Sequence, residues 1–213
     1  MRTDDLVTML ARGGAPADAL AVARRYAVGL AAGAGVALLL VTLVLGVRPD
    51  LGTAMRLPMF WIKFGYVAAL AAASVMLALR LSRPGERVAW TPIALAAPVI
   101  AMWVLALVVV ERGGGQDFAS QFFGRTWRSC PLLIALLSIP LFVAMFWVMR
   151  GMAPTRLRAA GAVAGLVAGA GATLAYALHC PELGAPFLGF WYVLGMLVPT
   201  AAGALLGPRL LQW

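Results

Sequence analysis

The sequence predicts an all-α membrane protein, a bundle of six transmembrane helices with both the N- and the C-terminus in the cytoplasm. Of its 213 residues, 63% are hydrophobic and 12% are charged, whereas soluble domains are about 45–50% apolar and about 25% charged. The mean hydropathy is +0.93. Such a chain has too few polar side chains to cover a globule in water. We therefore do not expect a soluble enzyme, a disordered tail or a disulfide-rich secreted module.

Six segments are long and apolar enough to cross a bilayer, whose core of about 30 Å needs about 20 helical residues. The alternation of a membrane barrel is absent. The expected spans are Tyr26–Val47, Met59–Leu79, Trp90–Val110, Pro131–Met149, Ala159–Leu178 and Phe187–Leu206. The first exceeds the roughly 15 apolar residues of a signal peptide, so we expect it to be retained. The chain then divides into a cytoplasmic segment 1–25, a transmembrane domain 26–207 and a cytoplasmic tail 208–213.

The distribution of arginines indicates the orientation. With the N-terminus in the cytoplasm, the inner segments carry eleven arginines and the outer links carry five, as the positive-inside rule favours. A net charge of +9 can also indicate nucleic-acid binding. Here the charged residues lie between long apolar runs, so we expect the protein to interact with the lipid bilayer rather than with nucleic acid.

Lys63 is the one charged residue within the six expected spans. A charge inside a membrane is a functional candidate by default. Its long side chain can also reach the interface, and the neighbouring Trp61 and Tyr66 are typical of an interfacial belt. The sequence therefore favours an anchor over a functional role for Lys63.

Small residues recur along the fifth span, where Gly161, Gly165 and Gly169 are spaced by four. This spacing lets two helix backbones approach closely. It favours packing within one bundle, and a dimer face is the alternative.

The N-terminal segment 1–25 is a candidate for partner binding. Asp4 and Asp5 suit the first turn of a short helix, and one apolar face is formed by Leu6, Met9 and Leu10. Such a face can lie on the membrane surface or dock into the groove of a partner. The segment is too short to hold an active site.

Two cysteines are expected at one outer boundary of the bundle. Cys130 begins the fourth span and Cys180 follows the fifth, and a short inner link makes these spans antiparallel neighbours. A structural disulfide, a redox- or metal-responsive thiol pair and two inert cysteines remain as alternatives. His179 and Glu182 flank Cys180 and are candidate metal or supporting ligands beside the two thiols. No hydrolase, P-loop or dinucleotide motif is present, so we do not expect an enzyme.

Several short motifs resemble, in their order and spacing, the NrsF-like family of six-span membrane anti-sigma factors. They are Thr3-Asp4-Asp5-Leu6, Cys130-Pro131, His179-Cys180-Pro181-Glu182 and Gly207-Pro208-Arg209-Leu210-Leu211. The resemblance implies a bacterial inner-membrane protein that holds an extracytoplasmic-function sigma factor at the cytoplasmic face. It also implies release of the sigma factor under oxidative or heavy-metal stress.

The resemblance further implies that Cys130 and Cys180 are the sensing residues. They would act through a disulfide or a transiently bound heavy-metal ion, with no cofactor required. A small transporter or metal-handling protein and a structural membrane anchor are the alternatives, although the absence of an internal repeat and of a mid-membrane carboxylate weighs against a transporter.

Overall fold

The computed structural model describes residues 19–82, 90–112, 118–152 and 154–212, and these ranges form helices and no strand. Six helical segments are long and apolar enough to cross a membrane. They are α2 (Ala19–Leu40) with the π-helical turn η1 (Val41–Leu45), α4 (Pro58–Leu81), α5 (Thr91–Arg112), α7 (Cys130–Arg150), α8 (Leu157–Tyr176) and α10 (Val193–Leu210). The last follows α9 (Ala185–Phe187) and η2 (Leu188–Tyr192). The prediction of six helical spans is confirmed.

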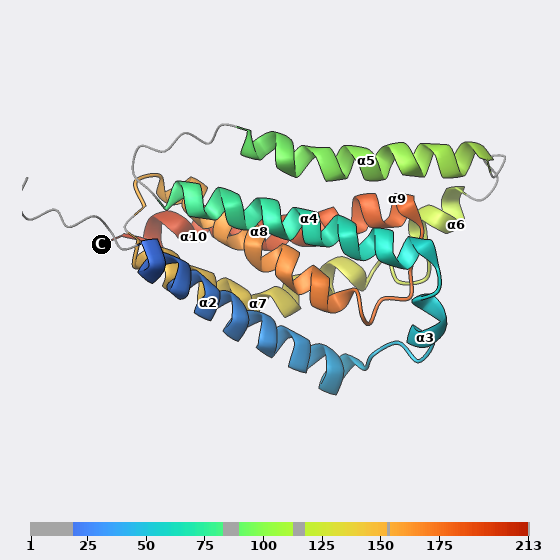
Figure 1. Cartoon of the computed structure of the whole chain (residues 1–213), viewed down its shortest axis with the longest axis horizontal. Helices are drawn as coiled ribbons and strands as arrows, with labels where there is room; N and C mark the ends of the chain where they lie inside the picture. Colours follow the sequence, from blue (N-terminus) through green and yellow to red (C-terminus); the bar gives the residue numbers. More distant parts are fainter. Residues whose placement is uncertain (1–18, 83–89, 113–117, 153, 213) are drawn as a thin grey trace, which may run out of the picture.

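Two short helices complete the described fold, α3 (Leu51–Ala54) and α6 (Phe118–Phe123). They lie with α9 at one end of the bundle, which we call the far end (Figure 1). The start of α2 and the C-terminus lie at the opposite end, which we call the terminal end.

Helix α2 begins at Ala19, before the predicted first span, and the stretch long and apolar enough to cross a membrane, Leu20–Leu45, includes Arg24 and Arg25. Both arginines are at the terminal end, where long cationic side chains can reach the interface. The sequence-based prediction left these two arginines out of the span because they are charged, although the helix includes them.

Helix α8 is the centre of the bundle and α5 is its periphery. In α8, 72% of the apolar window is buried within the protein, against 11% in α5. Helices α10, α7, α4 and α2 all pack on α8, whereas α5 lies along one side of the bundle (Figure 1). The alanine and glycine content of α8 explains this position, because small side chains let four neighbours approach one helix.

The glycine stripe of α8 faces α10 of the same chain. A Cβ atom at Gly161 would collide with the carbonyl oxygen of Gly203, and one at Gly165 would collide with that of Pro199. Gly169 packs in the same way on Met196. All three glycines are buried within one chain, so the stripe leaves no surface there for a second copy.

Candidate functional site

Both cysteines lie at the far end, in one cluster of buried side chains. Cys130 is the first residue of α7. Cys180 lies in the connection from α8 to α9, residues 177–184, which we call the cysteine loop. Both side chains are 0% exposed, and both are free thiols.

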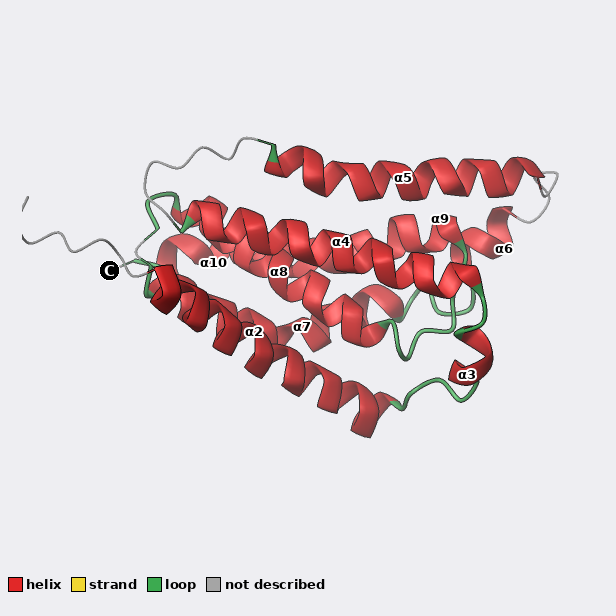
Figure 2. Cartoon of the chain, viewed as in Figure 1, coloured by secondary structure: helices red, strands yellow, loops and turns green. Residues whose placement is uncertain are grey.

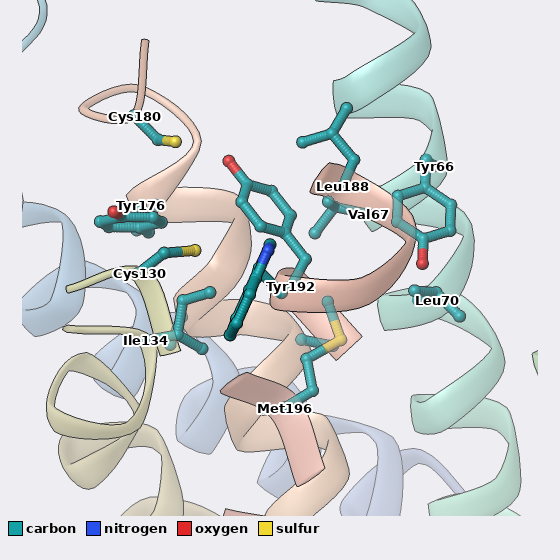
Figure 3. Close-up of a cluster of buried hydrophobic side chains, with 14 of the residues drawn as sticks. Tyr66, Val67, Leu70, Cys130, Ile134, Tyr176, Cys180, Leu188, Tyr192 and Met196 are labelled. Atoms are coloured by element: carbon teal, nitrogen blue, oxygen red, sulfur yellow. The ribbon is translucent and has the colours of Figure 1, made fainter. Parts of the chain in front are cut away.

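The aromatic ring of Tyr176 lies between the two cysteine side chains, and Tyr192 lies beside them (Figure 3). Both thiols interact electrostatically with the Tyr176 side chain. Its ring also approaches that of Tyr192, with centroids 6.1 Å apart. Joining Cys130 to Cys180 therefore requires Tyr176 to move.

Lys63 connects α4 to the cysteine loop. Its side chain is 0% exposed, and Nζ donates hydrogen bonds to the carbonyl oxygens of Cys180 at 2.7 Å and Glu182 at 3.3 Å. The ammonium group also lies 5.7 Å from the centroid of the Tyr192 ring. The interpretation of Lys63 as an interfacial anchor is wrong, because the cysteine loop folds over the ammonium group and supplies its acceptors.

His179 and Glu182 connect the cysteine loop to two other parts of the far end. His179 Nδ1 forms a hydrogen bond of 2.8 Å with the carbonyl oxygen of Gly46, just after α2. The Glu182 carboxylate accepts hydrogen bonds from the Arg125 backbone N–H at 2.7 Å and the Thr126 hydroxyl at 3.4 Å, just before α7. In the described ranges, no three His, Cys, Asp or Glu side chains group around one point as metal ligands would.

A further contact comes from the segment after α2. The Arg48 backbone N–H donates to the Leu178 carbonyl at 3.2 Å, and the Arg48 guanidinium donates twice to the Asp50 carboxylate, each time at 2.7 Å. This hydrogen bonding lowers the pKa of Asp50 below its ordinary value and raises the pKa of Arg48. The pair lies in the connection from η1 to α3, one of the loops that gather at the far end (Figure 2).

The cysteine loop therefore contacts the far ends of α2 and α4 and the segment that leads into α7. Sequence reasoning missed the positions of Tyr176 and Tyr192 beside the thiols, because aromatic residues in an apolar span look like ordinary core. It also missed Gly46, because every residue has a backbone carbonyl group and the residue type does not show which one accepts a hydrogen bond.

The predicted partner-binding residues Asp4, Asp5, Leu6, Met9 and Leu10 lie outside the described residues. The terminal end from which their segment leaves is basic, with exposed arginines at positions 24, 150, 156, 158 and 209. The described carboxylates Asp50, Glu111 and Glu182 lie at the far end instead.

Comparison with known proteins gives consistent matches over the whole chain. The profile of a family described as NrsF, negative regulator of sigma F, matches residues 10–213. The chain is 53% identical over 213 residues to a probable anti-sigma-F factor NrsF of Azospira oryzae, covering 100% of both chains. It is 39% identical over 217 residues to the anti-sigma-F factor NrsF of Caulobacter vibrioides, again covering 100% of both. No solved structure was found to match it.

Proposed function

The chain belongs to the NrsF family of negative regulators of sigma F, and we propose that it is an inner-membrane anti-sigma factor controlled by Cys130 and Cys180. It sequesters an extracytoplasmic-function sigma factor on its cytoplasmic side and releases it under oxidative or heavy-metal stress. It acts as a regulator and not as an enzyme. The observation that carries this proposal is the pair of free buried thiols beside a loop that contacts the ends of three spans.

The chemistry available to the thiols is simple. An oxidant joins the two sulfurs, accepts two electrons and leaves two protons to the solvent. A soft divalent cation instead binds both sulfurs as thiolates and displaces the two protons. Either event needs the sulfurs to converge, so the Tyr176 ring leaves its place between them.

Displacement of Tyr176 provides the route to the rest of the bundle. Tyr176 is the last residue of α8, and the cysteine loop that follows holds α4 through Lys63 and the end of α2 through His179. A shift of this loop therefore changes the positions of three spans at their far ends. Because the helices are rigid, these changes are carried to the terminal end.

The energy of one disulfide suits a modest switch. A disulfide stabilises a folded protein by about 2–4 kcal/mol against the unfolded chain; the same amount, if it separated two folded conformations, would change their ratio roughly 30-fold to 900-fold. If the resting protein favours retention of the sigma factor by about tenfold, this change releases most of it. Complete inversion of a resting ratio of about 99:1 between the retaining and the releasing conformation would need about 5.5 kcal/mol. This exceeds the energy that one disulfide supplies.

The terminal end is the side proposed to hold the sigma factor. The described part of this end holds arginines and no carboxylate, whereas the far end holds Asp50, Glu111 and Glu182 beside its own arginines, and the positive-inside rule then favours the terminal end as the cytoplasmic side. The basic surface suits acidic patches on a partner. The apolar residues Leu6, Met9 and Leu10 of segment 1–25 suit a groove in the same partner.

Sensing is tested in cells that carry Cys130→Ser, Cys180→Ser or both, with a reporter gene driven by the released sigma factor. We expect each variant to lose induction by oxidant or thiophilic metal. Ser138→Ala is the matched control, because this buried serine donates only within its own helix and should leave induction unchanged. Normal induction in all three cysteine variants would refute the sensing role.

Retention is tested separately by co-purification of the unstressed protein. We expect a sigma factor to copurify with the full-length chain and to be lost when residues 1–18, which precede α2 and include Leu6, Met9 and Leu10, are deleted. Recovery of other membrane subunits would favour a structural anchor. Recovery of no partner, together with substrate flux in reconstituted vesicles, would favour a transporter.

A further inference from the structure

A shallow cavity of about 430 Å³ opens at the terminal end, between the start of α2 and the end of α7. Its lining combines two cations with an apolar wall, and consists of Leu20, Ala21, Arg24, Arg25, Val28 and Trp147. Leu20, Val28 and Trp147 are exposed. The cavity therefore offers apolar surface and positive charge side by side at the level where a span meets the headgroup region.

Arg25 is held in a fixed position in this cavity. Its guanidinium group donates a hydrogen bond of 2.8 Å to the Trp147 carbonyl oxygen and stacks on the Trp147 ring, 4.4 Å from the centroid. On its other side it packs so closely on Gly151 that a Cβ there would collide with it. The cation is thus placed before any ligand arrives.

The hydrogen bonding of Arg25 is incomplete. Its Nε atom is buried and has no hydrogen-bond partner among the described residues. The exposed Arg24 adds a second cation, and the described carboxylates lie at the other end of the bundle. No carboxylate of the described ranges therefore lies at the cavity.

We propose that this cavity binds the phosphate group of an anionic phospholipid. Arginine presents planar donors that match phosphate oxygens, so a phosphate group can pair with the guanidinium group of Arg25 while Arg24 contributes charge. Leu20 and Val28 then contact the glycerol and the first acyl carbons. The apolar wall favours a lipid over free phosphate, because free phosphate has no apolar group to contact this wall. This inference is independent of cysteine sensing and goes beyond the anti-sigma role.

The bound lipid would join the start of α2 to the end of α7. We therefore expect anionic lipid to stabilise the terminal end of the bundle, where the sigma factor is proposed to be held.

The test uses the purified full-length protein in detergent, titrated with phosphatidylglycerol or phosphatidylcholine, with retained lipid counted by native mass spectrometry. We expect phosphatidylglycerol to be retained about tenfold more tightly than phosphatidylcholine. Arg24→Gln and Arg25→Gln should each weaken its retention about tenfold, the effect of losing one charged hydrogen bond. Arg158→Gln, an exposed arginine at the same end but outside the cavity, is the matched control and should change retention less than twofold.

Three results would overturn the proposal. Equal retention of the two lipids would remove the requirement for a negative charge. An equal loss in Arg158→Gln would show a general effect of positive charge and no defined site. Displacement of the lipid by millimolar inorganic phosphate would show a phosphate site instead. If Arg25→Gln does not fold, Arg24→Gln decides the question, because its exposed side chain does not support the packing.

Discussion

Replacing Lys63 with methionine tests whether the cysteine loop is held by α4. The substitution keeps a long apolar side chain and removes the ammonium donor. The carbonyl oxygens of Cys180 and Glu182 then lose bonds of 2.7 Å and 3.3 Å. We expect the loop to open more often, which exposes the Cys180 thiol.

The magnitude follows from these two bonds. A hydrogen bond to a charged group contributes about 1.5–3 kcal/mol, and the longer of the two contributes at the lower limit or below. Removing the ammonium group also removes the cost of burying it. We take the net loss of free energy that favours the closed loop as about 2 kcal/mol, which raises the population of the open loop about 30-fold.

The assay is the rate at which a small maleimide labels Cys180, measured by peptide mass spectrometry and divided by the rate in denatured protein. When opening is fast relative to labelling, this ratio follows the open population. Arg128→Met is the matched control, because it removes an exposed cation from the same end. An unchanged rate in Lys63→Met, or an equal rise in Arg128→Met, would show that Lys63 does not hold the loop.

Three further predictions follow from other contacts. Gly165→Val should destabilise the bundle by about 3 kcal/mol or more, because its Cβ lies on the α10 backbone; Gly35→Ala, with open space around it, should leave the melting temperature unchanged or higher. Tyr176→Leu should speed disulfide formation between the thiols under mild oxidant, measured by gel shift, whereas Tyr66→Leu in the same cluster should not. The pKa of Asp50 is lowered in the folded protein, so its contribution to stability should be complete above about pH 4 and should be lost as the pH falls through the pKa of the folded state. Asp50→Asn should abolish this part of the dependence of the melting temperature on acid pH. An unaltered pH dependence would exclude a stabilising Arg48–Asp50 ion pair.

The spans could be predicted because a transmembrane helix is a local property of a long apolar run. The placement of both cysteines at one end also follows from counting spans. The contact of Lys63 with the cysteine loop could not be predicted, because it depends on the path of a loop far away in sequence. His179 and Glu182 look like ligands because they are adjacent to Cys180, yet the loop backbone directs one toward Gly46 and the other toward Arg125.

The glycine stripe of α8 likewise has one property that the sequence predicts and one that it does not. Its spacing predicts a close approach of two backbones, whichever helix supplies the second. That α10 is this partner depends on the glycines of α10, including Gly203 and Gly207, which face the stripe from the other side. Neither set of glycines identifies the other from sequence alone.

The composition of α8 also has a thermodynamic consequence for assembly in a bilayer. Alanine and glycine have no side-chain rotamers to lose, and they make up twelve of the twenty residues of α8. The most enclosed of the six described spans therefore becomes ordered at a reduced cost in side-chain entropy. Weak dispersion contacts are therefore enough to keep it in place. A longer side chain on this face would both collide with a neighbour and bring rotational freedom that folding must then remove.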